Sequence, residues 1–127
     1  MFRLTKTLQI SSSHNLNLPY SSPCRNVHGH NWKIEVYVAG KNLNDAGVLI
    51  DFGELKDHLA EIIAGLDHKF LNELDAFHDR FPPSSENIAR HIAEALQAKI
   101  DDPAAKVTRV TAWESESACA TYILDPD

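Results

Sequence analysis

The stretch that decides the fold is HGHNWKIEVYVA, residues 28–39. Apolar side chains fall on every second position from Trp32 to Val38, and mostly polar side chains occupy the positions between them. Because successive side chains of a strand point to opposite faces, this alternation predicts a strand with one face in the core. His28 and His30 continue the core-facing row, so we expect both imidazoles on one side of the strand end, at roughly 7 Å spacing.

Further strands are predicted on both sides of this stretch. Apolar residues among threonines over residues 2–11 indicate a strand that ends near His14, and a loop over residues 15–26 follows. Two last strands, at about 106–114 and 118–124, are joined by the turn Ser115-Glu116-Ser117.

Two helices are predicted in the middle of the chain. Asp51 precedes Glu54 by three residues, as in a capping box, and apolar residues follow at helical spacing up to Leu66. A serine cap at Ser84 or Ser85 opens the second helix, whose apolar face extends to Ile100.

This order of elements, ββααββ, predicts an α+β fold. We expect residues 1–127 to form a single domain with a four-stranded antiparallel sheet and both helices against one face. Such a sheet has two open edges, and joining sheets between subunits into a closed barrel would cover them. The fold class therefore predicts a homo-oligomer.

Composition excludes several functions. The formal net charge is −6, with 18 acidic against 12 basic residues, which argues against a general nucleic-acid surface. Neither a membrane-spanning run nor the apolar core of a signal peptide is visible, so a cytoplasmic protein with free thiols is expected. We expect Cys119 to be a small core residue and Cys24, in the loop, to be the reactive thiol.

His14, His28 and His30 are the candidate metal ligands. Three imidazoles without an obvious fourth ligand are typical of a catalytic zinc site, because structural sites are usually closed by four protein ligands. The alternative is a polar strand surface without a metal.

Cys24 precedes His28 by four positions, and a nearby metal ion or imidazolium would favour its thiolate, a base or nucleophile. Cys24 could instead be a metal ligand or a loop cysteine without a role.

Two further positions carry groups suited to chemistry. Asp67 directly precedes His68, and a carboxylate that orients an imidazole makes an acid or base near pH 7, provided that the loop bends the two together. Glu114 ends the third strand, where a carboxylate could accept two parallel N–H bonds from the guanidine-like edge of a pterin or guanine. Glu116 is its rival. The remaining histidines, His58, His78 and His91, are expected on the surface.

Nearly the whole chain resembles the 6-pyruvoyl-tetrahydropterin synthase family. The matching segments are His14, Cys24-x-x-x-His28-Gly29-His30, Val48-Leu49-Ile50-Asp51-Phe52, Leu66-Asp67-His68-Lys69-Phe70-Leu71-Asn72, Pro83-Ser84-Ser85-Glu86-Asn87-Ile88-Ala89 and Trp113-Glu114. The resemblance implies a tunnelling fold, in which sheets join between subunits into barrels that stack as a hexamer with sites at the interfaces.

The same resemblance implies roles for the candidate residues. His14, His28 and His30 would bind Zn²⁺ and Cys24 would be the catalytic thiol. Asp67 and His68 would form a proton relay, and Glu114 would anchor the pterin ring.

Spacing within the motif indicates one branch of the family. The three residues between Cys24 and His28 resemble the bacterial 6-carboxytetrahydropterin synthases of queuosine (7-deazaguanine) biosynthesis, whereas the biopterin-forming branch typically has five. No glutamate lies between His14 and His30, which argues against the folate branch.

The resemblance thus implies that 7,8-dihydroneopterin triphosphate is the substrate. Alternatives are elimination to 6-pyruvoyl-tetrahydropterin, or a catalytically silent zinc-binding or pterin-binding oligomer. Candidate triphosphate ligands are Lys6, Arg25 and Arg80.

Overall fold

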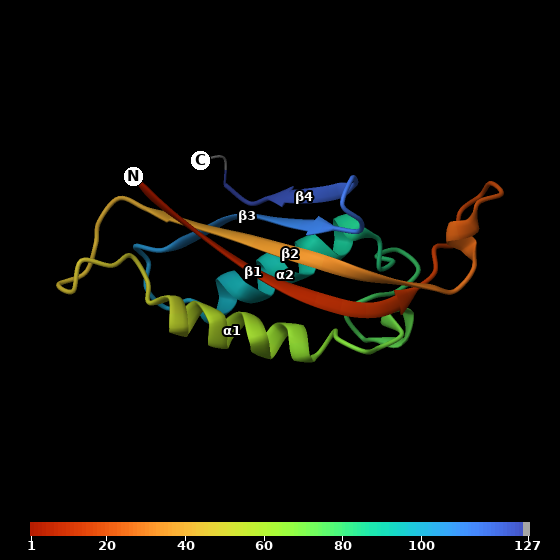
Figure 1. Cartoon of the computed structure of the whole chain (residues 1–127), viewed down its shortest axis with the longest axis horizontal. Coiled ribbons are helices and arrows are strands. Elements are labelled where there is room, and N and C mark those ends of the chain that lie inside the picture. The colour runs from red at the N-terminus through yellow and green to blue at the C-terminus, as the bar shows by residue number, and fades with distance from the viewer. Residues whose placement is uncertain (126–127) are drawn as a thin grey trace.

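The computed structural model describes residues 1–125, and its elements follow the predicted order (Figure 1). The four strands are β1 (Phe2–His14), β2 (His28–Gly40), β3 (Lys106–Trp113) and β4 (Cys119–Ile123). The two α-helices are α1 (Phe52–Ala64) and α2 (Ser85–Lys99), and short 3₁₀ helices span Pro23–Arg25 and Leu71–Glu73.

The strands form one antiparallel sheet in the order β1-β2-β3-β4, so β1 and β4 are its edges. The alternation predicted for residues 28–39 is confirmed, because Trp32, Ile34, Val36 and Val38 are fully buried. β1 and β2 pair along their whole lengths, from Phe2 opposite Gly40 to His14 opposite His28. This long hairpin carries the sheet beyond the helices to the end where the histidines lie.

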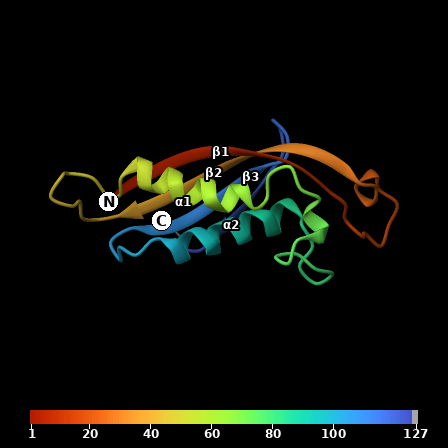
Figure 2. The ribbon, with the colours of Figure 1, turned by 90° about the horizontal axis from the view of Figure 1, so that it is seen from below.

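Both helices cover one face of the sheet, as predicted (Figures 1 and 2). The side chain of Asp51 accepts a hydrogen bond from the Gly53 N–H and caps α1. At α2 the cap is Ser84, which accepts from the N–H of Asn87 at 3.2 Å. The apolar faces of the two helices and the inner side of the sheet form one core. Both capped helix starts thus confirm the sequence-based boundaries to within one residue.

The helices end earlier than predicted. α1 ends at Ala64 and α2 at Lys99, although Leu66 and Ile100 remain buried in the turns that follow. An apolar residue that continues a helical spacing into a turn can still pack on the core, so periodicity alone overextends the helix.

The prediction that Cys119 is a core residue is wrong. Its side chain is exposed, because Cys119 pairs with Trp113 and points to the face of the sheet away from the helices. On β4 the half-buried positions are Ala120 and Tyr122. The strand has five residues, and its sequence lacks the clear alternation of apolar and polar side chains that would show which face is inward.

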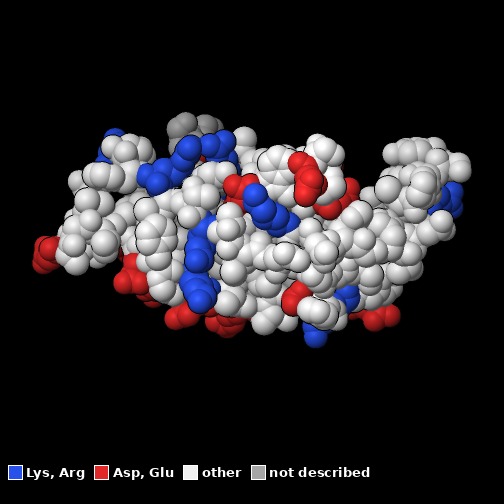
Figure 3. Space-filling model, viewed as in Figure 1, with Lys and Arg blue, Asp and Glu red and all other residues white. Residues whose placement is uncertain are grey.

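On the face of the molecule seen in Figure 3, surface charge is mixed rather than concentrated. On the face seen in Figure 3, basic and acidic side chains are interspersed, without the continuous basic surface typical of nucleic-acid binding. Within residues 1–125, none of the helices combines the length and the apolar character that a bilayer crossing requires.

Candidate metal centre and adjoining cavity

Pairing of β1 with β2 brings three histidines together. His14 lies directly opposite His28, and His30 follows two residues later on the same face of β2. One nitrogen from each imidazole lies within 4.8 Å of the others. The predicted convergence of these side chains is therefore present, and the group could hold one metal ion.

Hydrogen bonds fix which nitrogen two of the three rings, those of His14 and His28, present. Nδ1 of His14 lies 2.7 Å from the carbonyl oxygen of Pro83, and Nδ1 of His28 lies 2.7 Å from that of Asn26. Because a carbonyl oxygen only accepts, both Nδ1 atoms carry the proton and donate. Each Nε2 then keeps a lone pair, and the Nε2 of His14 is buried without a hydrogen-bond partner among residues 1–125.

This arrangement fits a metal ion. Metal-binding histidines usually donate their second ring N–H to a carbonyl or a carboxylate, which orients the imidazole. Burial lowers the pKa of His14, and the neighbouring His28 and His30 lower it further, against a raising effect of the Pro83 carbonyl. Burial also lowers the pKa of His30, against the nearby Glu114 carboxylate. Both rings therefore favour the neutral form that ligates metals.

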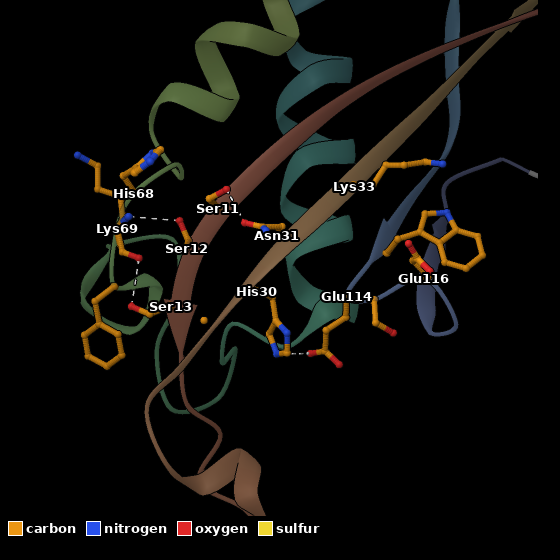
Figure 4. A pocket seen from close by; sticks show the side chains of 14 residues that line it. Ser11, Ser12, Ser13, His30, Asn31, Lys33, His68, Lys69, Glu114 and Glu116 are labelled. Atoms are coloured by element: carbon orange, nitrogen blue, oxygen red, sulfur yellow. Dashed lines mark hydrogen bonds and ion pairs between the residues drawn. The ribbon is translucent and has the colours of Figure 1, made fainter.

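Glu114 extends the group from the end of β3. Its Oε1 lies 3.4 Å from Nε2 of His30 and 3.8 Å from Nε2 of His14, and the side chain is 34% exposed (Figure 4). The carboxylate is thus within reach both of the histidines and of a molecule arriving from solvent. Glu116, its predicted rival, is exposed and lies farther along the same cavity wall.

The loop after α1 brings Asp67 and His68 together. Oδ2 of Asp67 accepts a hydrogen bond from Nδ1 of His68 at 2.8 Å, and its Oδ1 accepts from the Ser11 N–H at 2.7 Å. These bonds lower the pKa of Asp67, the Ser11 amide contributing most, against an opposing effect of burial that exceeds the contribution of the hydrogen bond from the His68 side chain. His68 has a φ of +56°, a left-handed conformation uncommon for a side-chain-bearing residue. Such strain is often found at functional sites.

Ser12 holds this loop against β1. Its hydroxyl donates to the Leu66 carbonyl at 2.5 Å and accepts from the Lys69 N–H at 3.2 Å, so one buried side chain joins both flanks of Asp67-His68. The His68 N–H donates to the Ser11 carbonyl at 2.7 Å and completes the attachment. The strained turn is thus fixed to the edge of the sheet.

We expect Ser12→Ala to lower the free energy of unfolding by about 1–3 kcal/mol, because it leaves the buried Leu66 carbonyl and the partly buried Lys69 N–H without their partner. Ser13→Ala is the matched control, since among residues 1–125 the Ser13 hydroxyl makes only a solvent-exposed contact of 3.4 Å to the Lys69 carbonyl. Urea unfolding of both variants measures the effect. Equal stabilities of the two variants would contradict the role assigned to Ser12.

A cavity of about 1110 Å³ adjoins the histidines (Figure 4). Its lining includes His30, Glu114 and His68, so three of the candidate residues share one space. The basic residues on its wall are Lys33 and Lys69, and the candidates Lys6, Arg25 and Arg80 do not line it. Sequence reasoning missed both lysines, although Lys69 directly follows the Asp-His pair and Lys33 follows Trp32 on β2.

Cys24 lies in the loop that projects beyond the sheet between β1 and β2 (Figure 1). Its thiol is free and half-buried, and it lines a second hollow of about 760 Å³ that also contains Glu114. The mutually close ligand atoms described above belong to histidines, and Cys24 is outside that group. The arrangement gives no support to Cys24 as a metal ligand, and Cys24 lines a different hollow from His68, whereas Glu114 lines both.

His91 is more enclosed than predicted. Its ring lies 5.7 Å from the ring of the buried Phe77, and burial lowers its pKa, against a raising effect of Glu94. His91 occupies the edge of the apolar face of α2, where helical periodicity does not separate core from surface. It lies outside the metal group.

The sequence matches known proteins along most of its length. The model of the family described as 6-pyruvoyl tetrahydropterin synthase matches residues 3–124. A Bacillus subtilis protein named 6-carboxy-5,6,7,8-tetrahydropterin synthase is 32% identical, over 98% of this chain and 86% of its own length. An Archaeoglobus fulgidus protein, named as a suspected synthase of the same compound, is 36% identical over 82% of both chains.

The fold also matches a solved structure over nearly its whole length. The 6-pyruvoyl tetrahydropterin synthase of Caenorhabditis elegans superposes with a TM-score of 0.84 at 24% identity, over 96% of this chain and 94% of its own. The sheet and helix arrangement is thus a known one.

Proposed function

Because the chain belongs to the 6-pyruvoyl tetrahydropterin synthase family, we propose that it converts 7,8-dihydroneopterin triphosphate to 6-carboxy-5,6,7,8-tetrahydropterin. One water molecule is consumed in this reaction, and acetaldehyde and triphosphate are released; the reaction serves queuosine biosynthesis in the cytoplasm. The name of the Bacillus subtilis relative supports this assignment, as does the spacer of three residues between Cys24 and His28.

The observation that carries the proposal is the convergence of three imidazoles beside a cavity that also contains Glu114 and His68. A cavity of about 1110 Å³ is large enough for a bicyclic ring with a phosphorylated side chain. Lys33 and Lys69 on its wall offer the positive charge that a triphosphate requires.

His14, His28 and His30 would hold the metal ion, which we propose to be zinc. When bound, zinc supplies Lewis acidity that lowers the cost of negative charge on substrate oxygen. The hydrogen bonds from Nδ1 to Pro83 and Asn26 prepare the rings of His14 and His28 for this role.

The other residues bind the ring and move protons. Glu114 accepts the N–H groups on the amino-pyrimidinone edge of the pterin, which fixes the side chain relative to the acid and base groups. Cys24, as thiolate, takes a proton from the substrate side chain, and His68 shuttles protons on the opposite side. Asp67 holds the His68 ring through its Nδ1–H and stabilises the imidazolium that forms.

The proposed assembly is a hexamer. β1 and β4 are the two edges of the sheet, and pairing between the edges of neighbouring chains would close a barrel. In such an assembly Cys24, on the projecting loop, would lie near a subunit boundary. This accounts for a thiol that lines a different hollow from His68 within one chain.

Product analysis tests the proposed reaction. We expect the purified, metal-replete protein to consume 7,8-dihydroneopterin triphosphate. Mass spectrometry should identify the products as 6-carboxytetrahydropterin, acetaldehyde and triphosphate. A protein that binds zinc and pterin without consuming substrate would be a silent binding oligomer, and the proposal would be wrong.

The second candidate is elimination of triphosphate to 6-pyruvoyl-tetrahydropterin, the activity named for the Caenorhabditis elegans neighbour. It uses the same residues and differs in leaving the carbon-carbon bond intact. Absence of acetaldehyde, together with the mass of the pyruvoyl product, would favour it.

A further inference from the structure

The carboxylate of Glu114 is attached to a partly buried chain of two hydrogen bonds that starts on β2. Nε1 of Trp32 donates to Oγ of Ser85 at 3.1 Å, and Oγ of Ser85 donates to Oε1 of Glu114 at 3.4 Å. Trp32 is fully buried, and Ser85 is the half-buried first residue of α2. The chain thus connects the core, a helix start and the end of β3.

The direction of this chain follows from its chemistry. An indole N–H can only donate, so Ser85 Oγ must accept from Trp32. The single hydroxyl proton of Ser85 then remains for Glu114, whose ionised carboxylate only accepts. Because Trp32 is packed against the rings of His14 and His30, at 4.9 and 5.1 Å, the chain starts from a fixed point.

The end of the chain lies where ligand recognition is needed. The Oε1 atom that accepts from Ser85 is the atom that lies 3.4 Å from Nε2 of His30. A glutamate side chain has three rotatable torsions and is 34% exposed here, so without a fixed donor it would sample several orientations. One donor fixed at the start of α2, the half-buried Ser85, reduces that freedom before a ligand arrives.

We propose that Ser85, oriented by Trp32, is a positioning residue that holds the Glu114 carboxylate beside the histidines and thereby sets the affinity for a ring with a guanidine-like edge. The inference rests on the proposed function of Glu114 as the ring anchor. Preorganisation of this kind improves binding by removing the entropy cost of ordering the side chain in the complex.

The neighbouring serine provides a matched control. Ser84 accepts from the Asn87 N–H and caps α2, whereas the hydroxyl of Ser85 makes no capping contact. Ser84→Ala therefore weakens the start of the helix without touching the chain to Glu114. Ser85→Ala removes the hydrogen bonds that link Trp32 to Glu114 and leaves the Ser84 cap intact. A general disturbance of α2 and a specific effect on Glu114 are thus separable.

The experiment compares wild type, Ser85→Ala, Ser85→Thr and Ser84→Ala. We expect Ser85→Ala to raise the Kd for 7,8-dihydroneopterin and the KM for its triphosphate by about 5- to 30-fold, the cost of a weak hydrogen bond to a charged group, because this bond is 3.4 Å long. Zinc per chain should be unchanged and kcat should change less than KM. Ser85→Thr keeps the hydroxyl and should restore the affinity. Ser84→Ala should lower the Tm and leave Kd unchanged.

A crystal structure of Ser85→Ala supplies a readout that needs no ligand. The proposal predicts that the Glu114 carboxylate leaves its place beside His30 or occupies several orientations. An unmoved, single carboxylate in Ser85→Ala would overturn the inference, as would equal Kd values for Ser85→Ala and wild type. If wild type makes no pterin product, the proposed function fails, and the crystal structure still decides the role of Ser85.

Discussion

The His28→Ala protein is expected to lose its metal and its turnover together. His28 offers one of three converging nitrogens, and its ring is already oriented by the Asn26 carbonyl. Loss of a residue that only orients a metal ligand typically costs 10- to 100-fold in metal affinity, so loss of the ligand itself should cost at least about 100-fold. Metal analysis after dialysis, with an assay of the same sample, measures both quantities.

His78→Ala is the control for this variant. His78 is exposed, lies on the loop before α2 and is outside the metal group. We expect it to keep one metal ion per chain and to retain wild-type turnover. A His28→Ala protein that retained a full complement of metal would show that His28 is not a ligand.

Replacing Cys24 with alanine is expected to lower kcat by about 10²- to 10⁴-fold, the usual contribution of a positioned acid or base. Metal content should be unchanged, because Cys24 lies outside the group of histidines. Steady-state kinetics with 7,8-dihydroneopterin triphosphate, with metal analysis of the same preparation, measures this result.

The second cysteine controls for loss of a thiol as such. Cys119 is exposed on the outer face of β4 and lines the same hollow as Cys24 without an assigned role, so Cys119→Ala should retain kcat within about twofold of wild type. If Cys24→Ala also turned over at the wild-type rate, the thiol would have no part in the mechanism.

Local patterns predicted most of the fold. Strict alternation identified β2, because a strand with one face in the core must repeat every two residues. Asp51 and the pair Ser84-Ser85 marked the helix starts, because a side-chain oxygen is needed there to accept from free N–H groups, and the structure identifies Ser84 as the second cap. β4 lacks such a signal, and the prediction that Cys119 faces the core is therefore wrong.

The site was predictable only where it follows the same periodicity. His28 and His30 share a strand face, so their proximity could be inferred from their spacing. The Asp67-His68 contact depends on the left-handed φ of His68 and on the Ser11 amide, fifty-six positions from Asp67. No local pattern encodes a contact of that kind.

Long-range hydrogen bonds likewise could not be predicted from the sequence. The chain from Trp32 through Ser85 to Glu114 joins three elements, each of which has an ordinary local pattern. These bonds are set by how α2 packs on the sheet, and they appear only when the fold is assembled.

Removal and restoration of the metal tests the central claim, that three histidines hold an ion which the reaction requires. A chelator should abolish turnover of 7,8-dihydroneopterin triphosphate, and zinc should restore it at a stoichiometry of about one ion per chain, as expected for one group of three ligands. Metal-free protein that turns over at the full rate would contradict the account.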